Sequence, residues 1–161
     1  MTRPRREPPA WVRLLDRLNP LVVAVLRSPV HWLLGAGLML VSVTGRRSGR
    51  TYTIPVGYHD VGDAVIVLVS DAAHRQWWRN YRTPAGASLR LRGRPVAVDG
   101  WAPPPDDPEF GRRVEQAFRR VGFVARIFGI EFDPAVGLTD AQRAAFAGYA
   151  RVGVFRRVAT R

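Results

Sequence analysis

The spacing of apolar residues changes along the chain, from a helical period at the start to a strand pattern further on. Four apolar residues between Trp11 and Leu18 recur every three or four positions, with arginines on the opposite face, a pattern typical of an amphipathic helix. Prolines at 20 and 29 interrupt this pattern, because the residue before a proline disfavours the helical conformation. The sequence therefore predicts three short helices, over residues 11–19, 21–27 and 29–35.

From Leu38 onward the apolar runs have the length of strands. Leu38 to Val43 is a continuous apolar run, and Thr51 to Tyr58 is rich in β-branched and aromatic residues, which favour strands. Ala64 to Val69 is apolar throughout, as expected of a strand that is buried on both sides. The predicted strands are 38–43, 51–58, 64–69, the two arms of a hairpin over 87–98, and 151–158.

Helix signals return between and after these strands. The acidic pair before Pro108 and the threonine at position 139 are helix-start signals. A polar segment after the third strand is also expected to be helical, and its neighbouring Trp77 and Trp78 should not both face the core. The segment between the last two helices is apolar but irregular. The helices predicted here cover residues 71–83, 108–121 and 139–149.

Short turns connect most of the predicted strands, which makes an antiparallel arrangement the economical one. We therefore expect an α+β fold, a mainly antiparallel β-barrel decorated by N-terminal and C-terminal helices. A chain of 161 residues is the size of one domain. Residues 1–10 are basic and proline-rich, so we expect them to be a disordered tail, with the single domain spanning residues 11–161.

Composition narrows the chemistry that the chain can carry. It has no cysteine and no lysine, which excludes disulfides, zinc–thiolate sites, cysteine nucleophiles and lysine Schiff bases. The formal net charge of +12 indicates anionic partners, and arginine favours bidentate contacts with phosphate or carboxylate. The three histidines lack the spacing of metal ligands, so we expect no metal site. The N-terminus lacks a signal-peptide core, and we expect a cytoplasmic protein.

The turn Thr44–Arg50, reading TGRRSGR between two predicted strands, is the strongest candidate for anion binding. Arg46, Arg47 and Arg50 lie within five residues, and neither the turn nor the following strand contains an acidic residue. Glycines on either side of the first two arginines let the backbone bend and present its N–H groups. On these residues alone, the turn is either an anion-binding loop or a solvated, arginine-rich hairpin tip.

Two blocks of the sequence resemble the deazaflavin (F420)-dependent nitroreductase and quinone reductase family. The first is LMLVSVTGRRSGRTYTIPVGY over residues 38–58. It is similar to the family's first strand, its T-G-R-[RK]-[ST]-G turn and its proline-containing second strand. The second block, Trp77–Asn80, resembles the family's W-[YW]-x-N helix. The likeness covers about residues 19–100.

The resemblance implies a split β-barrel, related to flavin-mononucleotide oxidases, that binds coenzyme F420, a deazaflavin with a phospholactyl-polyglutamate tail. It also implies roles for individual residues, the basic turn holding the acidic tail. The residues expected to bind the cofactor are Arg46, Arg47, Ser48, Gly49, Arg50, Pro55, Trp77, Trp78 and Asn80. Ser70 and Tyr149 are expected to face the substrate, and the proton donor is expected to be Tyr58, His74, Tyr149 or solvent.

By this resemblance, the chain is a deazaflavin-dependent oxidoreductase that transfers hydride from the reduced cofactor to a quinone, nitro compound or similar electrophile. FMN is the alternative cofactor. Two features depart from the family's pattern: Tyr52 stands where many relatives have arginine, and the loop from Ser70 to Trp77 is short. The alternative hypothesis is therefore a non-catalytic carrier of a flavin, tetrapyrrole or fatty acid.

Basic charge elsewhere in the chain suggests further partners. Six arginines and three aromatic residues occur between residues 72 and 98 without an acidic residue, a pattern that also suits nucleic-acid backbones. No nucleic-acid-binding motif accompanies it, so this hypothesis is the least favoured. The amphipathic N-terminal helix and its arginines predict peripheral association with the acidic inner face of a membrane. A homodimer is the hypothesis for the assembly.

Overall fold

The structure, a computed structural model, describes residues 20–27 and 37–159. Residues 20–27 are helical, as predicted, whereas the predicted tail 1–10 and helices 11–19 and 29–35 lie outside the described residues. The strands are β1 (Leu38–Thr44), β2 (Thr51–Gly57), β3 (His59–Asp60), β4 (Val65–Val69), β5 (Ala85–Leu91), β6 (Arg94–Trp101) and β7 (Arg151–Arg157). The remaining helices are η2 (Gln76–Tyr81), α2 (Pro108–Arg120), α3 (Val124–Ile127) and α4 (Asp140–Ala147).

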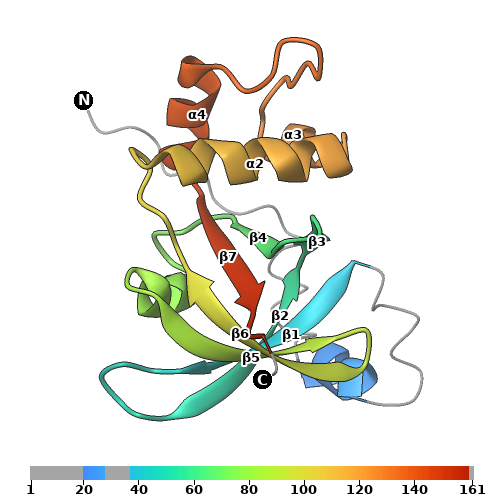
Figure 1. The fold of residues 1–161 in the computed structure, drawn as a ribbon, viewed down its shortest axis with the longest axis vertical. Helices are drawn as coiled ribbons and strands as arrows, with labels where there is room; N and C mark the ends of the chain where they lie inside the picture. Colours follow the sequence, from blue (N-terminus) through green and yellow to red (C-terminus); the bar gives the residue numbers. More distant parts are fainter. Residues whose placement is uncertain (1–19, 28–36, 160–161) are drawn as a thin grey trace.

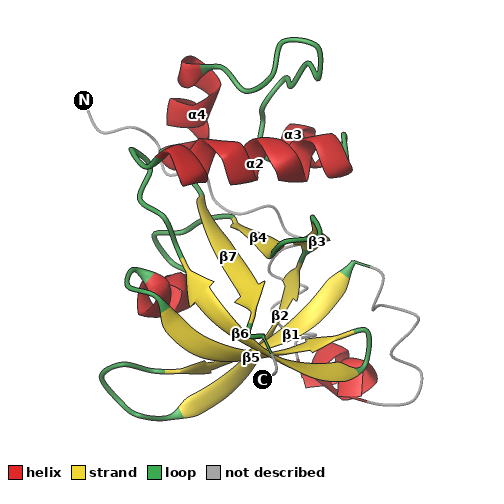
Figure 2. Ribbon diagram, in the orientation of Figure 1, coloured by secondary structure: helices red, strands yellow, loops and turns green. Residues whose placement is uncertain are grey.

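All seven strands form one antiparallel sheet in the order β2-β1-β5-β6-β7-β4-β3. The two edge strands, β2 and β3, are nevertheless consecutive in the chain, with only Tyr58 between them. The sheet must therefore curl until its two edges meet at Tyr58, which is buried. Figures 1 and 2 show this curled sheet, with α2, α3 and α4 gathered at one end of it. The predicted antiparallel, split-barrel type of fold is confirmed.

Strands β4 and β7 separate two apolar cores. Successive side chains of a strand point to opposite faces, so Val65, Val67 and Val69 pack inside the curled sheet, whereas Ile66 packs against the helices. In β7, Phe155 faces the inside and its neighbours face the helices in the same way. Because β4 is buried on both sides, its sequence is apolar throughout, as the sequence predicted.

The predicted helix starts are confirmed by their capping hydrogen bonds. At α2, the Asp107 side chain accepts a hydrogen bond of 2.8 Å from the Glu109 N–H. At α4, Thr139 and Gln142 form a reciprocal capping box, each side chain accepting from the other's backbone N–H, at 3.2 and 3.1 Å. These contacts satisfy N–H groups that the helix itself leaves unpaired.

The segment 71–83 differs from its prediction. Asp71 adopts a positive φ of 49°, and its carbonyl accepts hydrogen bonds from two later N–H groups, so a separate turn precedes the short helix η2. Both Trp77 and Trp78 are buried in the core inside the sheet, and the prediction that they could not both face the core was wrong. Neighbouring residues of a 3₁₀ helix point in directions 120° apart. Both tryptophans can be buried because other parts of the protein pack against two sides of η2.

Two other predictions need a smaller correction. No strand was predicted between 51–58 and 64–69, yet the short strand β3 lies there and pairs with β4. The apolar segment 122–138, expected to be irregular, contains the one-turn helix α3. Strand β3 has only two residues and α3 only four, and local periodicity over so few residues does not reveal them.

A network of ion pairs around the buried Arg113 holds α2 against the sheet. The Arg113 side chain is 1% exposed and donates to Glu109 Oε1 at 2.7 Å. It also donates to both carboxylate oxygens of Asp63, in the β3–β4 turn, at 2.8 and 2.6 Å. Arg156 of β7 reaches the same Glu109 oxygen at 2.7 Å. The end of the molecule that carries α2 is therefore held by paired charges, in contrast to the basic turn.

Candidate functional site

The basic turn connects β1 and β2, whose paired residues run from Leu38 opposite Gly57 to Thr44 opposite Thr51. The expectation that it joins two paired strands is confirmed. Gly45 donates from its N–H to the Arg50 carbonyl at 2.9 Å and accepts from the Gly49 N–H at 2.8 Å. Gly49 has a φ of +64°, a conformation that favours glycine. The two glycines thus fold the turn back on itself.

Several donors of this turn have no acceptor among the described residues. Arg46, Arg47 and Arg50 are exposed, and no carboxylate in the described part of the chain pairs with them. The backbone N–H groups of Arg47 and Ser48 likewise have no partner among the described residues. Ser48 Oγ accepts from the Arg50 N–H at 3.3 Å, which leaves its own proton free to donate. Three guanidinium groups, two amides and a hydroxyl form a donor set suited to a phosphate or carboxylate.

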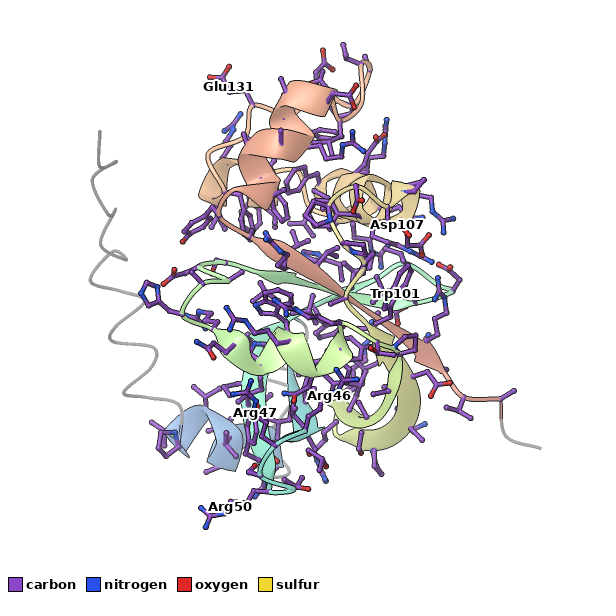
Figure 3. All side chains as sticks on the ribbon, turned by 90° about the vertical axis from the view of Figure 1, so that its left-hand side faces the viewer. Arg46, Arg47, Arg50, Trp101, Asp107 and Glu131 are labelled. Carbon is purple, nitrogen blue, oxygen red and sulfur yellow. The ribbon has the colours of Figure 1, made fainter. Side chains whose placement is uncertain are left out.

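The hydroxyl group of Ser48 lies on the inner side of the same turn. A Cβ added at Gly45 would lie 2.7 Å from Ser48 Oγ, so a larger residue there would force the Ser48 side chain to move. Figure 3 shows Arg46 and Arg47 beside η2 and Arg50 at the outer tip. The residues present therefore fit the anionic tail of the implied cofactor.

Asn80 joins the turn to η2. Its Oδ1 accepts a hydrogen bond of 3.1 Å from the Arg46 N–H, and its Nδ2 donates to the Trp77 carbonyl at 2.9 Å. Nδ2 also lies 3.4 Å from the hydroxyl of Tyr52. The two sequence blocks that carry the family resemblance are therefore in direct contact, and Tyr52, where relatives have arginine, takes part in that contact.

The two tryptophans of η2 have different surroundings. Trp77 is 9% exposed and stacks on Phe155, with ring centroids 6.4 Å apart. Trp78 is 7% exposed, and its indole N–H donates to the Ala72 carbonyl at 2.9 Å. Trp77 therefore belongs to the core that supports the site. Pro55 is half-buried in β2, and Ser70 is half-buried where the chain leaves β4. Their cofactor and substrate contacts stay predictions.

A cavity of about 260 Å³ lies beside η2, and we call it the Trp78 cavity. It brings together Trp78 and Tyr149, which the sequence assigned to cofactor and substrate. Its other lining residues are Asp71, Ala72, Ala73, Arg79, Arg82, Gly148 and Arg151. The run of arginines after residue 72 pointed to basic charge here, but no sequence signal indicated Arg151.

The three candidate proton donors lie in different environments. Tyr149 is 44% exposed and lines the Trp78 cavity. His74 Nδ1 lies 2.8 Å from the carboxylate of Asp71, on an exposed side chain. Tyr58 is buried at the β2–β3 corner, and its hydroxyl interacts with Arg92, which raises the pKa of that arginine. Of the three, Tyr149 shares a cavity with a predicted cofactor-binding residue.

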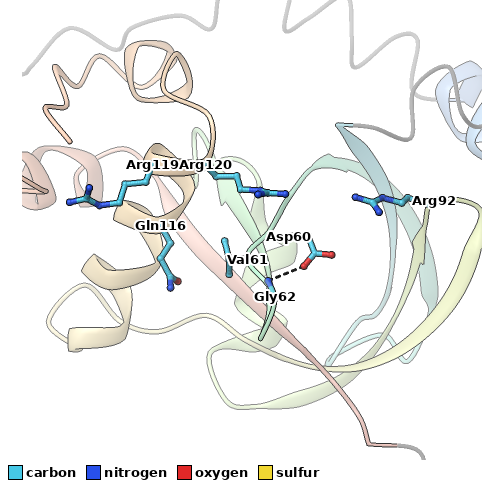
Figure 4. Close-up of a pocket in the computed structure, with 7 residues that line it drawn as sticks. All are labelled: Asp60, Val61, Gly62, Arg92, Gln116, Arg119 and Arg120. Atoms are coloured by element: carbon cyan, nitrogen blue, oxygen red, sulfur yellow. Dashed lines mark hydrogen bonds between the residues drawn. The ribbon is translucent and has the colours of Figure 1, made fainter. Parts of the chain in front are cut away.

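A larger, more open cavity of about 620 Å³ lies between α2 and the β3–β4 turn (Figure 4). It contains none of the residues that the sequence assigned to the site. Two of its four charged side chains are also paired, because Asp60 accepts from Arg157 at 2.9 Å and Arg119 pairs with Glu115 at 2.6 Å. The hydrogen bonds from Gly62 and Arg157 outweigh burial and lower the pKa of Asp60. This cavity is therefore a weaker candidate than the turn and the Trp78 cavity.

Neither a metal centre nor a membrane span emerges from the described ranges. Residues 20–27 and 37–159 contain no group of three or more histidine, aspartate or glutamate side chains able to hold a metal ion. No helix within these ranges has the length and apolar character needed to cross a bilayer.

The curled antiparallel sheet defines a protein of the split-barrel type, whose basic turn carries arginines without ion pairs among the described residues. Within that class, residues 21–120 match the model of the F420H(2)-dependent quinone reductase family. The chain belongs to this family. A comparison with curated proteins gave no match.

Solved structures agree with the fold. One described as a domain-swapped dimer has a TM-score of 0.53 at 14% identity, over 93% of this chain and 100% of that one. HutZ, described as the heme storage protein from Vibrio cholerae, has a TM-score of 0.50 at 10% identity, over 83% of this chain and 92% of its own. At such identities the likeness concerns the fold alone.

Proposed function

We propose that this protein is an oxidoreductase that binds reduced F420 and passes its hydride to a quinone, a nitro compound or a similar electrophile. The observation that carries the proposal is the basic turn. Arg46, Arg47 and Arg50 have no carboxylate partner in the described chain, and Asn80 fixes their turn against η2. Family membership supports the choice of F420 as the acidic ligand.

The chain's own residues would bind the cofactor, orient it and shield it from water. The turn would hold the phosphate and carboxylates of the tail with its guanidinium groups and with the free N–H groups of Arg47 and Ser48. The cofactor supplies a hydride and a proton, and a quinone that gains both becomes a hydroquinone. Trp78 would wall the ring, with Ser70 facing the substrate. Tyr149 is the proton donor best placed to protonate a reduced acceptor in the Trp78 cavity.

A titration panel tests the proposal. The purified protein is titrated with oxidised F420, FMN, haem and a duplex oligonucleotide, with ligand fluorescence or absorbance as the readout. We expect micromolar or tighter binding of F420, weaker binding of FMN, and turnover of a quinone with the reduced cofactor. Failure to bind either flavin would refute the proposal. Preferential binding of the duplex would favour the nucleic-acid hypothesis instead.

The alternative is a carrier that binds a flavin, tetrapyrrole or fatty acid without turnover. One observation favours it: the candidate proton donors are dispersed, with His74 bound to Asp71 and Tyr58 interacting with Arg92. The HutZ structure, described as a heme storage protein, shares the fold. Tight binding of F420 or haem, with no quinone reduction by the reduced protein–cofactor complex, would identify a carrier.

The assembly and the location of the protein stay predictions. Sedimentation velocity tests the homodimer, for which a monomer at all concentrations is the contrary result. Flotation with vesicles containing acidic lipid tests peripheral association through residues 11–19. A protein that stays with the soluble fraction would contradict that association.

A further inference from the structure

Three arginine side chains surround the indole of Trp78, and no carboxylate neutralises them. The guanidinium carbons of Arg79, Arg82 and Arg151 lie 5.9, 5.2 and 5.4 Å from the ring centroid. None of them forms an ion pair within the part of the chain that the structure describes. Burial lowers the pKa of Arg151, and the positive charge of Arg82 lowers it further. Bringing these like charges together is unfavourable, and a bound anion would relieve the repulsion.

The Trp78 cavity has the size and surface of a site for a small aromatic ligand. Its volume of about 260 Å³ is near the lower end of ligand pockets, which suits one or two rings rather than a whole cofactor. Ala72, Ala73 and Gly148 contribute small residues to its surface, and Tyr149 contributes an aromatic ring that is 44% exposed. The carboxylate on its lining, Asp71, already interacts with His74 at 2.8 Å.

The cationic wall of this cavity is held in place. The Trp78 indole is fixed by its hydrogen bond to the Ala72 carbonyl. The Arg151 guanidinium donates to the carbonyl of Ala150 at 2.7 Å and to that of Ala147. The neighbouring Asp71 holds a positive φ of 49°, a strained conformation of the kind that persists at functional sites. An arriving anion would therefore meet donors that are already ordered.

We propose that the Trp78 cavity is an acceptor subsite that binds an anionic aromatic molecule, its carboxylate, sulfonate or phosphate group lying between Arg82 and Arg151. The ring would pack beside Tyr149, over the small residues of the cavity. That this ligand is the electron acceptor rests on the proposed function above. That the cavity binds an anion is independent of the proposed function, since it depends only on the cavity and its arginines.

Calorimetric titration of the cofactor-free protein tests the binding. The probe is naphthalene-2-sulfonate, and naphthalene-2-sulfonamide is its neutral match. We expect the sulfonate to bind at least about tenfold more tightly than the sulfonamide, because each charge-assisted hydrogen bond adds appreciable free energy. Arg82→Gln should remove that preference. Arg82 forms no side-chain hydrogen bond among the described residues, so this variant should fold. Arg126→Gln, at an exposed arginine of α3, is the matched control.

A second measurement addresses the acceptor role. With reduced F420, Arg82→Gln should raise the KM for 1,4-naphthoquinone-2-sulfonate at least about tenfold more than it raises the KM for 1,4-naphthoquinone. Equal binding of the sulfonate and the sulfonamide would overturn the inference, as would displacement of the probe by oxidised F420. F420 binding without probe binding would refute only this inference. Probe binding without F420 binding would refute only the proposed function.

Discussion

Asn80 is the residue whose side chain connects the two halves of the candidate site. One amide group satisfies an N–H of the turn and a carbonyl of η2. This contact adds to the hydrogen bonds within the turn and links the backbone of Arg46 to η2. An amide suits this place because it donates and accepts at once, whereas alanine does neither.

Replacing Asn80 tests this connection. Asn80→Ala should weaken F420 binding by about three- to tenfold, since a lost hydrogen bond costs about 0.5–1.5 kcal/mol. The amide proton of Arg46 should also shift in the NMR spectrum toward a solvent-exposed value. Asn80→Asp is the control for the turn, because its carboxylate can still accept from the Arg46 N–H. An unchanged Arg46 amide in Asn80→Ala would show that the contact does not order the turn.

At the scale of elements, η2 is held against β6 and β7 by close packing. Gly100 of β6 faces Tyr81 and Phe155, whose rings meet edge to face with centroids 5.3 Å apart. A Cβ at Gly100 would lie 2.7 Å from Tyr81 and 2.8 Å from Phe155. Both rings are buried, so neither can move away without disturbing the core.

Gly100→Ala should therefore lower the free energy of unfolding by about 1–3 kcal/mol, the usual cost of overpacking. Gly86→Ala is the matched control, because Gly86 lies in the paired strand β5 and a Cβ there would meet nothing within 4 Å. We expect that control to be neutral or slightly stabilising. Chemical denaturation measures both, and equal stability of the two variants would contradict the packing described.

A helix or strand could be predicted from the sequence where its own residues determine it, without contacts to distant segments. Six of the seven strands and the caps of α2 and α4 depend on local periodicity and on single start residues, and they were predicted, whereas the two-residue strand β3 was not. The helix η2 was predicted too long, because the burial of Trp77 and Trp78 depends on Phe155 and on the Ala72 carbonyl. Arg151 was missed for the same reason. It reaches Trp78 through the β4–β7 register, in which it pairs with Val69.

At the scale of the whole molecule, charge is divided between a paired end and an unpaired end. Around α2, Glu109 accepts from Arg112, Arg113 and Arg156. The arginines of the turn and of the Trp78 cavity form no ion pair among the described residues. In a chain of net charge +12, the ion pairs around α2 therefore contribute to the fold, and the proposed ligand sites use the cations that have no ion pair.

The paired end predicts an acid dependence of stability. Burial raises the pKa of Glu109, but hydrogen bonds from Arg112 and Arg113 outweigh it, so the net pKa lies below the ordinary 4.5. A depressed carboxylate pKa adds stability above the ordinary value, and that stability is lost as the pH falls through the lower, folded value. Glu109→Gln should therefore cost about 3 kcal/mol at pH 6, and the difference from wild type should shrink as the pH falls below 4.5.

Denaturation curves at several pH values measure this effect. Glu131→Gln is the control, because Glu131 is exposed at the edge of the molecule and has no ion pair among the described residues (Figure 3). It should match wild type at every pH. A Glu109→Gln deficit that persists undiminished at low pH would show that the network contributes packing rather than charge.

The central claim is that the basic turn binds the acidic tail of F420. The most direct test measures the affinities of two ligands for the wild type and for one variant. The ligands are F420 and the deazariboflavin that lacks the phospholactyl-glutamate tail. Wild type should prefer F420 by about 100-fold, as expected of two charge-assisted contacts. Arg47→Ala should lose at least about tenfold of affinity for F420 and none for the tail-less ligand, with Arg126→Ala as the control. Equal weakening of both ligands, or of neither, would contradict the account.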